Sequence, residues 1–285
     1  MSKTVIITGA TSGLGYETAR KVAADPEVQL VLACRNPEKA QETVETIRKE
    51  TGNEHVRQMH IDLASLQSVR DFANSYKESD LGKIYCLVCN AGISPAHTGT
   101  TVDGYDLVFQ TNYLSSFLLI NLLLPDMEPD GKILVVSSDM HDPPGGLDWK
   151  SPTELAHDTS RSRYSYSKLA DLYLVYELSR RLRANGQKIR ADAFNPGYMQ
   201  TGFAPTNAAQ AAMVKMTMPH RFGDLGKSSS ALAELVTSGS LPAETGLYYD
   251  RSTNAVPSSA LSYNTENAQR LWQVSEELTG LKPKS

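Results

Sequence analysis

Tyr164 and Lys168 lie four residues apart, and residues with this spacing share one face of a helix. A tyrosine has a pKa of about 10 and exchanges protons poorly at neutral pH. A nearby cation favours the phenolate and lowers this pKa, and a helix N-terminus adds to the effect. The pair is therefore a candidate for acid–base catalysis. Because the same spacing is common in purely structural helices, its meaning depends on which other residues accompany it.

Three further polar groups accompany the pair. Ser137 and Ser138 end an apolar run, and Ser138 lies further out, so we expect Ser138 to hydrogen-bond a substrate oxygen. Asn90-Ala91-Gly92 ends the preceding apolar run in the same row. Asn112 lies inside a helical stretch, residues 104–124, although asparagine favours caps and turns. It is either part of the site or a polar residue on a helix surface.

A glycine-rich turn follows the first apolar run. Glycines permit a tight turn and a close backbone approach, and the N-terminus of the next helix offers free N–H groups to a pyrophosphate. The spacing is G-x-x-x-G-x-G, which differs from the ordinary dinucleotide fingerprint. Its position between a strand and a helix predicts a nucleotide site. The cofactor contacts expected from this turn are Gly9, Thr11, Ser12, Gly13, Leu14 and Gly15.

Arg35 stands twenty residues after Gly15, at the end of the second apolar run. An acidic residue there would bind the ribose 2′-hydroxyl of NAD, whereas an arginine suits the 2′-phosphate of NADP(H). Ser12 could add a hydroxyl to the same phosphate. The alternative is a solvated arginine paired with Glu38. We predict that the cofactor is NADP(H).

The elements that position these residues alternate along the chain. Short runs that are apolar along nearly their whole length are typical of parallel strands covered on both faces, and helical patterns such as 37–50 and 65–79 separate them. Asp62 and Ser65 are candidate caps of the second helix. Repeated β-α-β units predict an α/β fold, a doubly wound parallel sheet of Rossmann type with helices on both faces, as a single domain. The predicted strands are 4–8, 29–33, 56–60, 85–90, 132–137 and 189–195.

Two regions interrupt this alternation. Residues 139–163 form a polar insertion that is long for a connector, and residues 201–226 form a methionine-containing segment that we predict to be a lid. Both follow strands at their carboxyl ends, where ligands bind in open α/β sheets. Flexible thioethers suit a bulky, partly hydrophobic substrate, although a packed surface helix would have the same composition. His141 either contacts that substrate or is a solvated loop residue.

Composition excludes several classes of protein. The 285 residues are 40% hydrophobic and 21% charged, as in ordinary globular proteins. A net charge of −4 without a basic stripe argues against nucleic-acid binding. Cys86 and Cys89 lie three apart on one predicted strand, so their sulfurs should point to opposite faces, and we expect no metal site. Residues 113–124 are too short to span a bilayer and no signal region precedes the first strand, so we expect a cytoplasmic protein without a membrane span.

Taken in order, these motifs resemble the short-chain dehydrogenase/reductases over nearly the whole chain. The resemblance implies hydride transfer between NADP(H) and a carbonyl or alcohol carbon of a small-molecule substrate. It implies that Tyr164 exchanges the proton, and that Lys168 lowers the pKa of Tyr164 and holds the nicotinamide ribose. It also implies that Ser138 orients the substrate oxygen and that Asn112 supports a water-linked proton relay. The further cofactor contacts that it implies are Asp62, Leu63, Asn90, Ala91, Gly92, Pro196, Gly197 and Thr201.

Within that family, residues 33–36, 62–70 and 271–278 are similar to light-dependent protochlorophyllide reductases and to retinol-dehydrogenase-like members. The photoenzymes carry Thr where this chain has Ser138 and Cys where it has Tyr198, and their insertion before the tyrosine is longer. They also have Tyr-Lys-Asp-Ser-Lys where this chain has Tyr-Ser-Tyr-Ser-Lys. We therefore expect an ordinary dark reductase. The alternatives are a light-dependent double-bond reductase and a non-catalytic NADPH sensor. The resemblance alone adds the expectation of a homodimer through the long helices.

Overall fold

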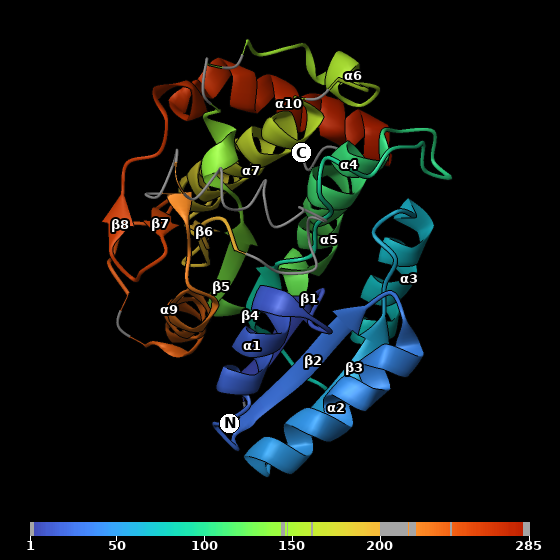
Figure 1. Cartoon of the computed structure of the whole chain (residues 1–285), viewed down its shortest axis with the longest axis vertical. Coiled ribbons are helices and arrows are strands. Elements are labelled where there is room, and N and C mark those ends of the chain that lie inside the picture. The colour runs from blue at the N-terminus through green and yellow to red at the C-terminus, as the bar shows by residue number, and fades with distance from the viewer. Residues whose placement is uncertain are drawn as a thin grey trace.

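The structure, a computed structural model, describes residues 3–143, 146, 148–160, 162–199, 216, 221–239 and 241–281. Within these residues the strands form one sheet of eight, in the order β3-β2-β1-β4-β5-β6-β7-β8 (Figure 1). All neighbouring pairs are parallel except β7 and β8. The strands are β1 (Lys3–Thr8), β2 (Val28–Cys34), β3 (Val56–His60), β4 (Ile84–Cys89), β5 (Met127–Val136), β6 (Arg190–Asn195), β7 (Tyr248–Asp250) and β8 (Ala255–Val256).

The predicted doubly wound parallel sheet is confirmed, with three differences in the strands. β5 begins at Met127 rather than at residue 132, because Met127 pairs with Ile84 before a shift in register. The last two strands were not predicted, since two or three residues are too few to show a pattern. The strand order reverses between β1 and β4, which are neighbours in the sheet. Ligands bind beyond the carboxyl ends of the strands at such a point.

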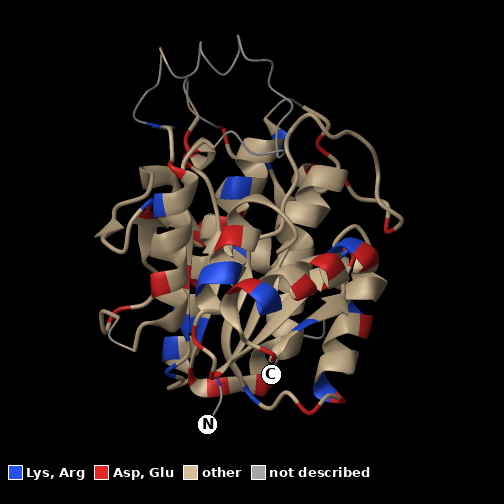
Figure 2. Cartoon of the chain, turned by 60° about the horizontal axis from the view of Figure 1, so that its bottom comes forward, with Lys and Arg blue, Asp and Glu red and all other residues tan. Residues whose placement is uncertain are grey.

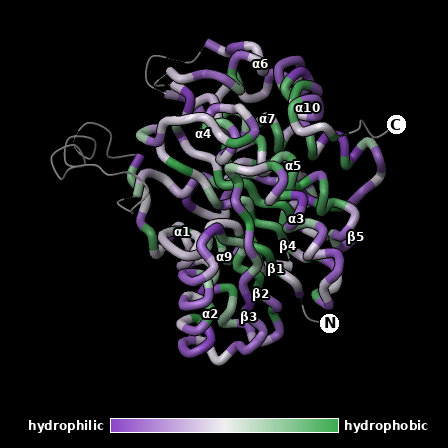
Figure 3. Tube along the Cα trace, turned by 90° about the vertical axis from the view of Figure 1, so that its right-hand side faces the viewer, coloured by the Kyte–Doolittle hydropathy of each residue, from purple (hydrophilic) through white to green (hydrophobic). Residues whose placement is uncertain are grey.

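Helices cover both faces of the sheet (Figure 1). One buried cluster joins the sheet to α1, α2 and α9, and the other joins it to α3, α5, α7 and α10. Hydrophobic residues follow the central strands, while the outer helices are more hydrophilic (Figure 3). The helices and helical turns are α1 (Gly13–Val22), α2 (Pro37–Thr51), α3 (Leu66–Lys77), α4 (Leu107–Phe109), η1 (Gln110–Leu114), α5 (Ser115–Leu123), η2 (Leu124–Asp126), η3 (Asp139–His141), α6 (Pro152–Leu155), α7 (Arg163–Ala184), α9 (Leu225–Thr237), η5 (Ala260–Tyr263) and α10 (Thr265–Thr279).

Local sequence explains where α2 and α3 begin. The Asn36 side chain accepts a hydrogen bond from the Lys39 N–H, and Pro37 occupies the first turn of α2, where its missing N–H costs nothing. Ser65 caps α3 through the Ser68 N–H. Asp62, the other predicted cap, does not cap α3. Its carboxylate instead accepts a hydrogen bond of 2.9 Å from the Ala64 N–H.

The long helix expected over residues 104–124 is not one continuous α-helix. It begins at Leu107, because the Asp106 side chain accepts a hydrogen bond from the Phe109 N–H. A π-helical turn, η1, follows before the α-helical pattern resumes in α5. Wide turns of this kind occur mostly as single turns, frequently at functional sites.

The apolar part of this region is also longer than expected. The helical run Leu107–Asp126 has 20 residues and a mean hydropathy of 1.5, which by length and composition alone would suffice to cross a membrane. In the structure 72% of this window is buried inside the protein. Core helices of soluble proteins have the same properties, so the run is weak evidence for a membrane span.

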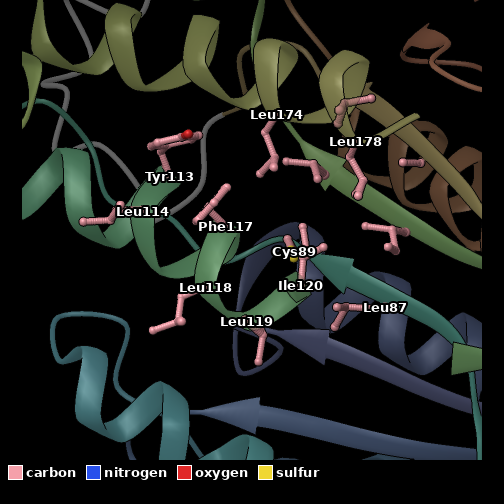
Figure 4. Close-up of a cluster of buried hydrophobic side chains, with 14 of the residues drawn as sticks. Leu87, Cys89, Tyr113, Leu114, Phe117, Leu118, Leu119, Ile120, Leu174 and Leu178 are labelled. Carbon is pink, nitrogen blue, oxygen red and sulfur yellow. The ribbon is translucent and has the colours of Figure 1, made fainter. Parts of the chain in front are cut away.

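The strand β4 places its two cysteines on opposite faces, as predicted. Cys86 belongs to the cluster under α1 and α9, and Cys89 belongs to the cluster under α5 and α7. Figure 4 shows Cys89 among Phe117, Ile120 and Leu87. Burial raises the pKa of each thiol to about 12, and both are free cysteines. They are small core residues.

The C-terminal helix α10 packs across α7 and α5. The Trp272 ring meets the edge of Phe117 at 4.9 Å between centroids, and Arg181 lies over Trp272 at 4.4 Å. The Tyr113 hydroxyl hydrogen-bonds the Ser275 hydroxyl at 2.7 Å. A homodimer through the long helices remains a prediction, and α10 already covers part of α7.

Acidic and basic residues are interspersed on the outer helices in the view of Figure 2.

Candidate active site

The turn between β1 and α1 has the shape of a phosphate cradle. Gly9 has φ +67°, and a Cβ there would lie 2.9 Å from the Ala91 Cα, so glycine is needed at this position. A Cβ on Gly15 would overlap the Asn90 side chain and the Gly9 carbonyl. Ser12 is the N-cap of α1, and its side chain makes no capping hydrogen bond. The open N-terminus of α1 therefore fits a pyrophosphate.

The end of β4 holds this turn in place. The Asn90 side chain donates to the Thr8 carbonyl at 2.9 Å. The N–H groups of Asn90 and Ala91 both donate to the Thr8 hydroxyl, at 3.0 and 2.9 Å. The Asn90 side chain thus helps to hold the glycine turn in shape. Thr8 was not predicted as a site residue, although a polar residue at the end of an apolar strand was a signal for it.

Arg35 directly follows β2 and is exposed. Within the described part of the chain it forms no ion pair, so the expected alternative of a pair with Glu38 is not seen. Asp62 and Leu63 follow β3 along the same edge of the sheet. Leu63 is buried, and its carbonyl accepts a hydrogen bond of 2.6 Å from Ser115. The residues predicted to surround the adenosine half of the cofactor therefore follow the ends of β2 and β3.

Asn112 lies in the π-helical turn and is buried at 2% exposure, so it is not a polar residue on a helix surface. Its side-chain oxygen accepts from the Ile93 N–H at 2.8 Å. Its amide group donates to the Ile93 carbonyl at 3.2 Å and to the Ser167 hydroxyl at 3.1 Å. The Asn112 side chain therefore links Ile93, in the segment after β4, to Ser167 on α7, the residue before Lys168.

Tyr164 and Lys168 lie on the first turns of α7, as predicted. The Lys168 Nζ is 5.8 Å from the centroid of the Tyr164 ring. A Cβ on Gly92 would lie 3.9 Å from this Nζ and 3.2 Å from the Asn112 Oδ1. Ser138 follows β5, and its side chain lies close enough to Tyr164 to favour the phenolate. The structure therefore gathers Tyr164, Lys168, Ser138, Asn112 and Gly92.

The pKa of Tyr164 differs from the expectation that the Lys168 cation lowers it below its usual value. Burial raises the pKa of Tyr164, while the Lys168 ammonium and the nearby Ser138 side chain lower it. In the protein alone burial outweighs these two effects, and the pKa lies above its usual value. Lys168 acts in the predicted direction, but it does not by itself bring the phenol to a neutral pKa.

The structure separates the two serines after β5. The Ser137 hydroxyl donates to the Lys168 carbonyl at 2.9 Å, so Ser137 fastens α7 to the sheet. The Ser138 hydroxyl accepts from the Met140 N–H at 3.1 Å and contacts the Asp139 carboxylate at 3.3 Å. The choice of Ser138 over Ser137 remains a prediction that this arrangement favours.

Asp171 is a residue of this region that the sequence analysis missed. Its Oδ2 accepts a hydrogen bond of 2.9 Å from the Lys168 Nζ, which also donates to the Val136 carbonyl at 2.9 Å. Burial raises the pKa of Asp171 to about 6, while Lys168 opposes this rise. The i, i+3 spacing of an acid and a base on one helix face was the signal that could have identified the pair.

His141 neither contacts solvent nor lies free in a loop. It is 5% exposed, and its Nδ1 lies 2.7 Å from the Ser138 carbonyl. Its Nε2 accepts from the Ser259 N–H at 3.1 Å. Both ring nitrogens are therefore satisfied in the neutral tautomer that carries its proton on Nδ1. The expectation of a solvated loop residue is wrong, since His141 is buried and holds two segments together; contact with the substrate stays a prediction.

Arg163 is a second residue that the sequence analysis missed. Its guanidinium donates to the carbonyls of Pro95 and His97 and, from its other end, to those of Thr159 and Ser160. It therefore fixes the loop after β4 to the turn that leads into Tyr164.

The residues after β6 lie at the same edge of the sheet as those after β4 and β5. Gly197 packs against Gly223, where a Cβ would lie 2.7 Å from the Gly223 N. The Ser228 hydroxyl donates to the Pro196 carbonyl at 2.8 Å. Thr201 and most of the predicted lid, residues 201–226, lie outside the described residues.

Comparisons with known proteins agree with this arrangement. The model of the short chain dehydrogenase family matches residues 3–212. The chain is 34% identical to retinol dehydrogenase 13 from Homo sapiens, over 99% of this chain and 86% of that protein. It is 33% identical to polyprenol dehydrogenase from Danio rerio, over 98% and 87% of the two chains.

Two solved structures have the same fold. An uncharacterised protein from Mycobacterium paratuberculosis has a TM-score of 0.77 and 32% identity, covering 99% of this chain and 95% of that one. A blue fluorescent protein from a metagenomic library, in complex with NADPH, has a TM-score of 0.67 and 23% identity, over 88% and 96% of the chains.

Proposed function

The chain belongs to the short chain dehydrogenase family, and on this premise we propose that it is an NADP(H)-dependent oxidoreductase. The proposed reaction is hydride transfer between the nicotinamide and a carbonyl or alcohol carbon of a bulky, partly hydrophobic substrate. One observation carries the proposal. The Tyr164 phenol lies beside the Lys168 ammonium and close enough to Ser138 for both to lower its pKa, at the sheet edge that bears the glycine turn.

Each side chain has a distinct task in this reaction. The bound dinucleotide would supply or take up the hydride. Tyr164 donates its phenolic proton to the substrate oxygen in reduction and removes it in oxidation. Ser138 hydrogen-bonds the same oxygen and orients it. Lys168 stabilises the phenolate that is left after reduction, because its ammonium lowers the pKa of Tyr164.

Asn112 and Lys168 support the proton path. We propose that Lys168 also holds the nicotinamide ribose, and the absence of a side chain on Gly92 beside it supports this role, since a Cβ there would lie 3.9 Å from the Nζ. Asn112 fixes the Ile93 backbone and Ser167, and so keeps the end of β4 aligned with α7. We propose that a water held near Asn112 carries the proton onward to solvent.

The preference for NADP(H) rests on Arg35. This arginine is exposed, directly follows β2, and forms no ion pair among the described residues. A guanidinium free to turn toward the ribose can hold a 2′-phosphate by two hydrogen bonds. The NADPH complex of the metagenomic protein concerns a chain of the same fold and supports this proposal.

The names of the relatives suggest the substrate class. Retinol and polyprenol are alcohols attached to long apolar chains, and these relatives match nearly the whole of this chain. Tyr198 and Phe222 pack edge to face at 5.1 Å beyond the carboxyl end of β6 and provide an apolar wall there. We propose that residues 139–163 and 201–226 cover such a substrate. A cytoplasmic location stays a prediction.

Initial rates of NADPH and NADH oxidation test this function. The substrates are retinal, other long-chain aldehydes, bulky ketones and a short aldehyde such as acetaldehyde, each in light and in darkness. We expect turnover in the dark, with NADPH favoured and the long aldehydes favoured over the short one. Tyr164→Phe should lower kcat by at least about a thousandfold and leave NADPH binding intact. Turnover by Tyr164→Phe at the wild-type rate would contradict the proposal.

Two outcomes correspond to the alternatives. Product formed only under illumination would indicate the light-dependent double-bond reductase. NADPH binding without turnover across the whole panel would indicate the non-catalytic sensor.

A further inference from the structure

We propose that Asp171 is a positioning residue for the Tyr164–Lys168 pair, one whose carboxylate fixes the Lys168 ammonium and opposes ionisation of the Tyr164 phenol. The inference rests on the proposed function for the role of Tyr164. It goes beyond that function because it adds a fifth side chain, Asp171, to the four that the proposed function assigns to the proton exchange.

The first argument is the geometry of a fully enclosed ion pair. Asp171 follows Lys168 by three residues on α7, and its Oδ2 lies 2.9 Å from the Lys168 Nζ. The side chain of Asp171 is 0% exposed and that of Lys168 is 6% exposed. A buried ammonium without a counter-charge would lose its proton or leave its place. Asp171 therefore keeps Lys168 both charged and in position.

The second argument is the number of donors on the ammonium. An ammonium group has three N–H donors. The Val136 carbonyl takes one at 2.9 Å and the Asp171 carboxylate takes another at 2.9 Å. One N–H donor therefore remains for another partner. The Tyr164 ring centroid lies 5.8 Å from this Nζ, and a Cβ on Gly92 would lie 3.9 Å from it.

The third argument is an unpaired oxygen. The Asp171 Oδ1 is buried and has no hydrogen-bond partner among the described residues. A buried polar atom without a partner costs stability, and an apolar or neutral residue of similar size would avoid that cost. A residue kept only for packing would not need this charge. The carboxylate is better explained by what it does to Lys168 and Tyr164.

The charges around Asp171 set the direction of its effect. Lys168 and Tyr164 face it from α7, Cys89 from β4 and Tyr113 from η1. Lys168 lowers the pKa of Tyr164, and the Asp171 carboxylate raises it, as does Asp139 from η3.

The same groups act on Lys168. Burial lowers the pKa of Lys168, but Asp171 and Tyr164 raise it and prevail. Neutralising Asp171 should therefore lower the pH at which the Tyr164–Lys168 pair loses its first proton, whether that proton leaves Tyr164 or Lys168.

The experiment is a nuclear magnetic resonance titration of the cofactor-free protein. Carbon-13 labels are placed on the tyrosine Cζ and the lysine Cε, and the two signals are assigned with Tyr164→Phe and Lys168→Met. In Asp171→Asn the first proton should leave the pair about one pH unit lower than in the wild type. If Asp171→Asn does not fold, Asp171→Ser removes the same charge with a smaller side chain, and the same shift is expected.

Asp192→Asn is the matched control. Asp192 is a 1% exposed carboxylate that pairs with Arg190 at 2.9 Å. Its neighbours on β6, Ala191 and Ala193, pack in the cluster with α7, so the side chain of Asp192 belongs to the opposite face of the sheet. The substitution should destabilise the fold without moving the titration of the pair. An unchanged or higher first titration in Asp171→Asn, or an equal shift in Asp192→Asn, would overturn the proposal.

A second readout is the pH profile of kcat/KM. The limb assigned to the pair should move downward by the same amount in Asp171→Asn, whereas a purely structural defect would lower kcat/KM at every pH. The titration needs neither cofactor nor substrate. If the wild type turns over no carbonyl substrate, the proposed function fails while the titration still decides the role of Asp171.

Discussion

The Nε2 of His141 accepts a hydrogen bond from the Ser259 N–H at 3.1 Å, although the two residues are 118 positions apart. The same ring contacts the Ser138 carbonyl through its Nδ1. The loop that carries Ser138, the serine proposed to orient the substrate, is thus tied to the segment that leads into α10. This link makes the order of the site dependent on the C-terminal part of the chain.

The first prediction concerns the pH dependence of this link. Burial lowers the pKa of His141, while its hydrogen bond to Ser138 raises it and only partly offsets the effect. The folded protein therefore binds fewer protons here than the unfolded chain, and stability should fall as the pH drops below about 6.5. His141→Gln should remove this component and cost about 1–3 kcal/mol at pH 8 through the altered hydrogen bonds. Urea unfolding at several pH values measures both, and parallel pH profiles for the two proteins would refute the assignment.

The second prediction tests the choice of cofactor. Arg35→Asp should lower the ratio of kcat/KM for NADPH over NADH roughly tenfold to a hundredfold, because a charged hydrogen-bond pair is replaced by repulsion. Lys49→Asp makes the same charge change at an exposed position on α2 and should leave the ratio unchanged. Steady-state kinetics with both cofactors provide the measurement. A ratio that does not move in Arg35→Asp would exclude this residue from the 2′-phosphate site.

The third prediction concerns the joint between β4 and α7. Asn112→Ala leaves both polar groups of Ile93 and the Ser167 hydroxyl without their partner. It should lower stability by about 2–4 kcal/mol and reduce kcat by at least about tenfold.

A matched control for this change lies on the next helix. Asn121 donates only to the Phe117 carbonyl, within α5. Asn121→Ala should change stability by less than about 1 kcal/mol and leave kcat unaltered. Equal effects of the two substitutions on stability and on kcat would contradict the role given to Asn112 in aligning β4 with α7.

The fourth prediction concerns the helix that covers α5 and α7. Trp272→Ala should destabilise the fold by about 3–5 kcal/mol, since it empties a buried site next to Phe117 and Arg181. Val102→Ala, at a residue that is 85% exposed, should change stability by less than about 0.5 kcal/mol. Chemical denaturation measures both variants. Light scattering on the same samples gives the oligomeric state and tests the expected homodimer.

Local patterns were sufficient for the main outline of the fold. Apolar runs separated by helical stretches predicted the parallel sheet, and Ser65 was a correct candidate cap for α3. The cap of α2 at Asn36 was not predicted. The glycine turn and the Tyr164–Lys168 spacing also depend on neighbours in the chain, so they were visible without coordinates. These features are local, and a single sequence records them.

The rest of the site depends on contacts between distant segments. Thr8 receives two N–H groups from the end of β4, and His141 meets Ser259, and neither contact leaves a trace in local spacing. The π-helical turn contains Asn112, whose side chain bonds the distant residues Ile93 and Ser167, and no helix-breaking residue in the local sequence marks it. The net effect of burial on Tyr164 likewise required the packed structure.

The burial of the thiols has a practical consequence. Cys34, Cys86 and Cys89 are the only cysteines of the chain and are all 3% exposed or less. Thiol-reactive dyes should therefore label the native protein very slowly. A cysteine introduced in place of the exposed Val102 would react first, so a single fluorophore could be attached without removing any native sulfur.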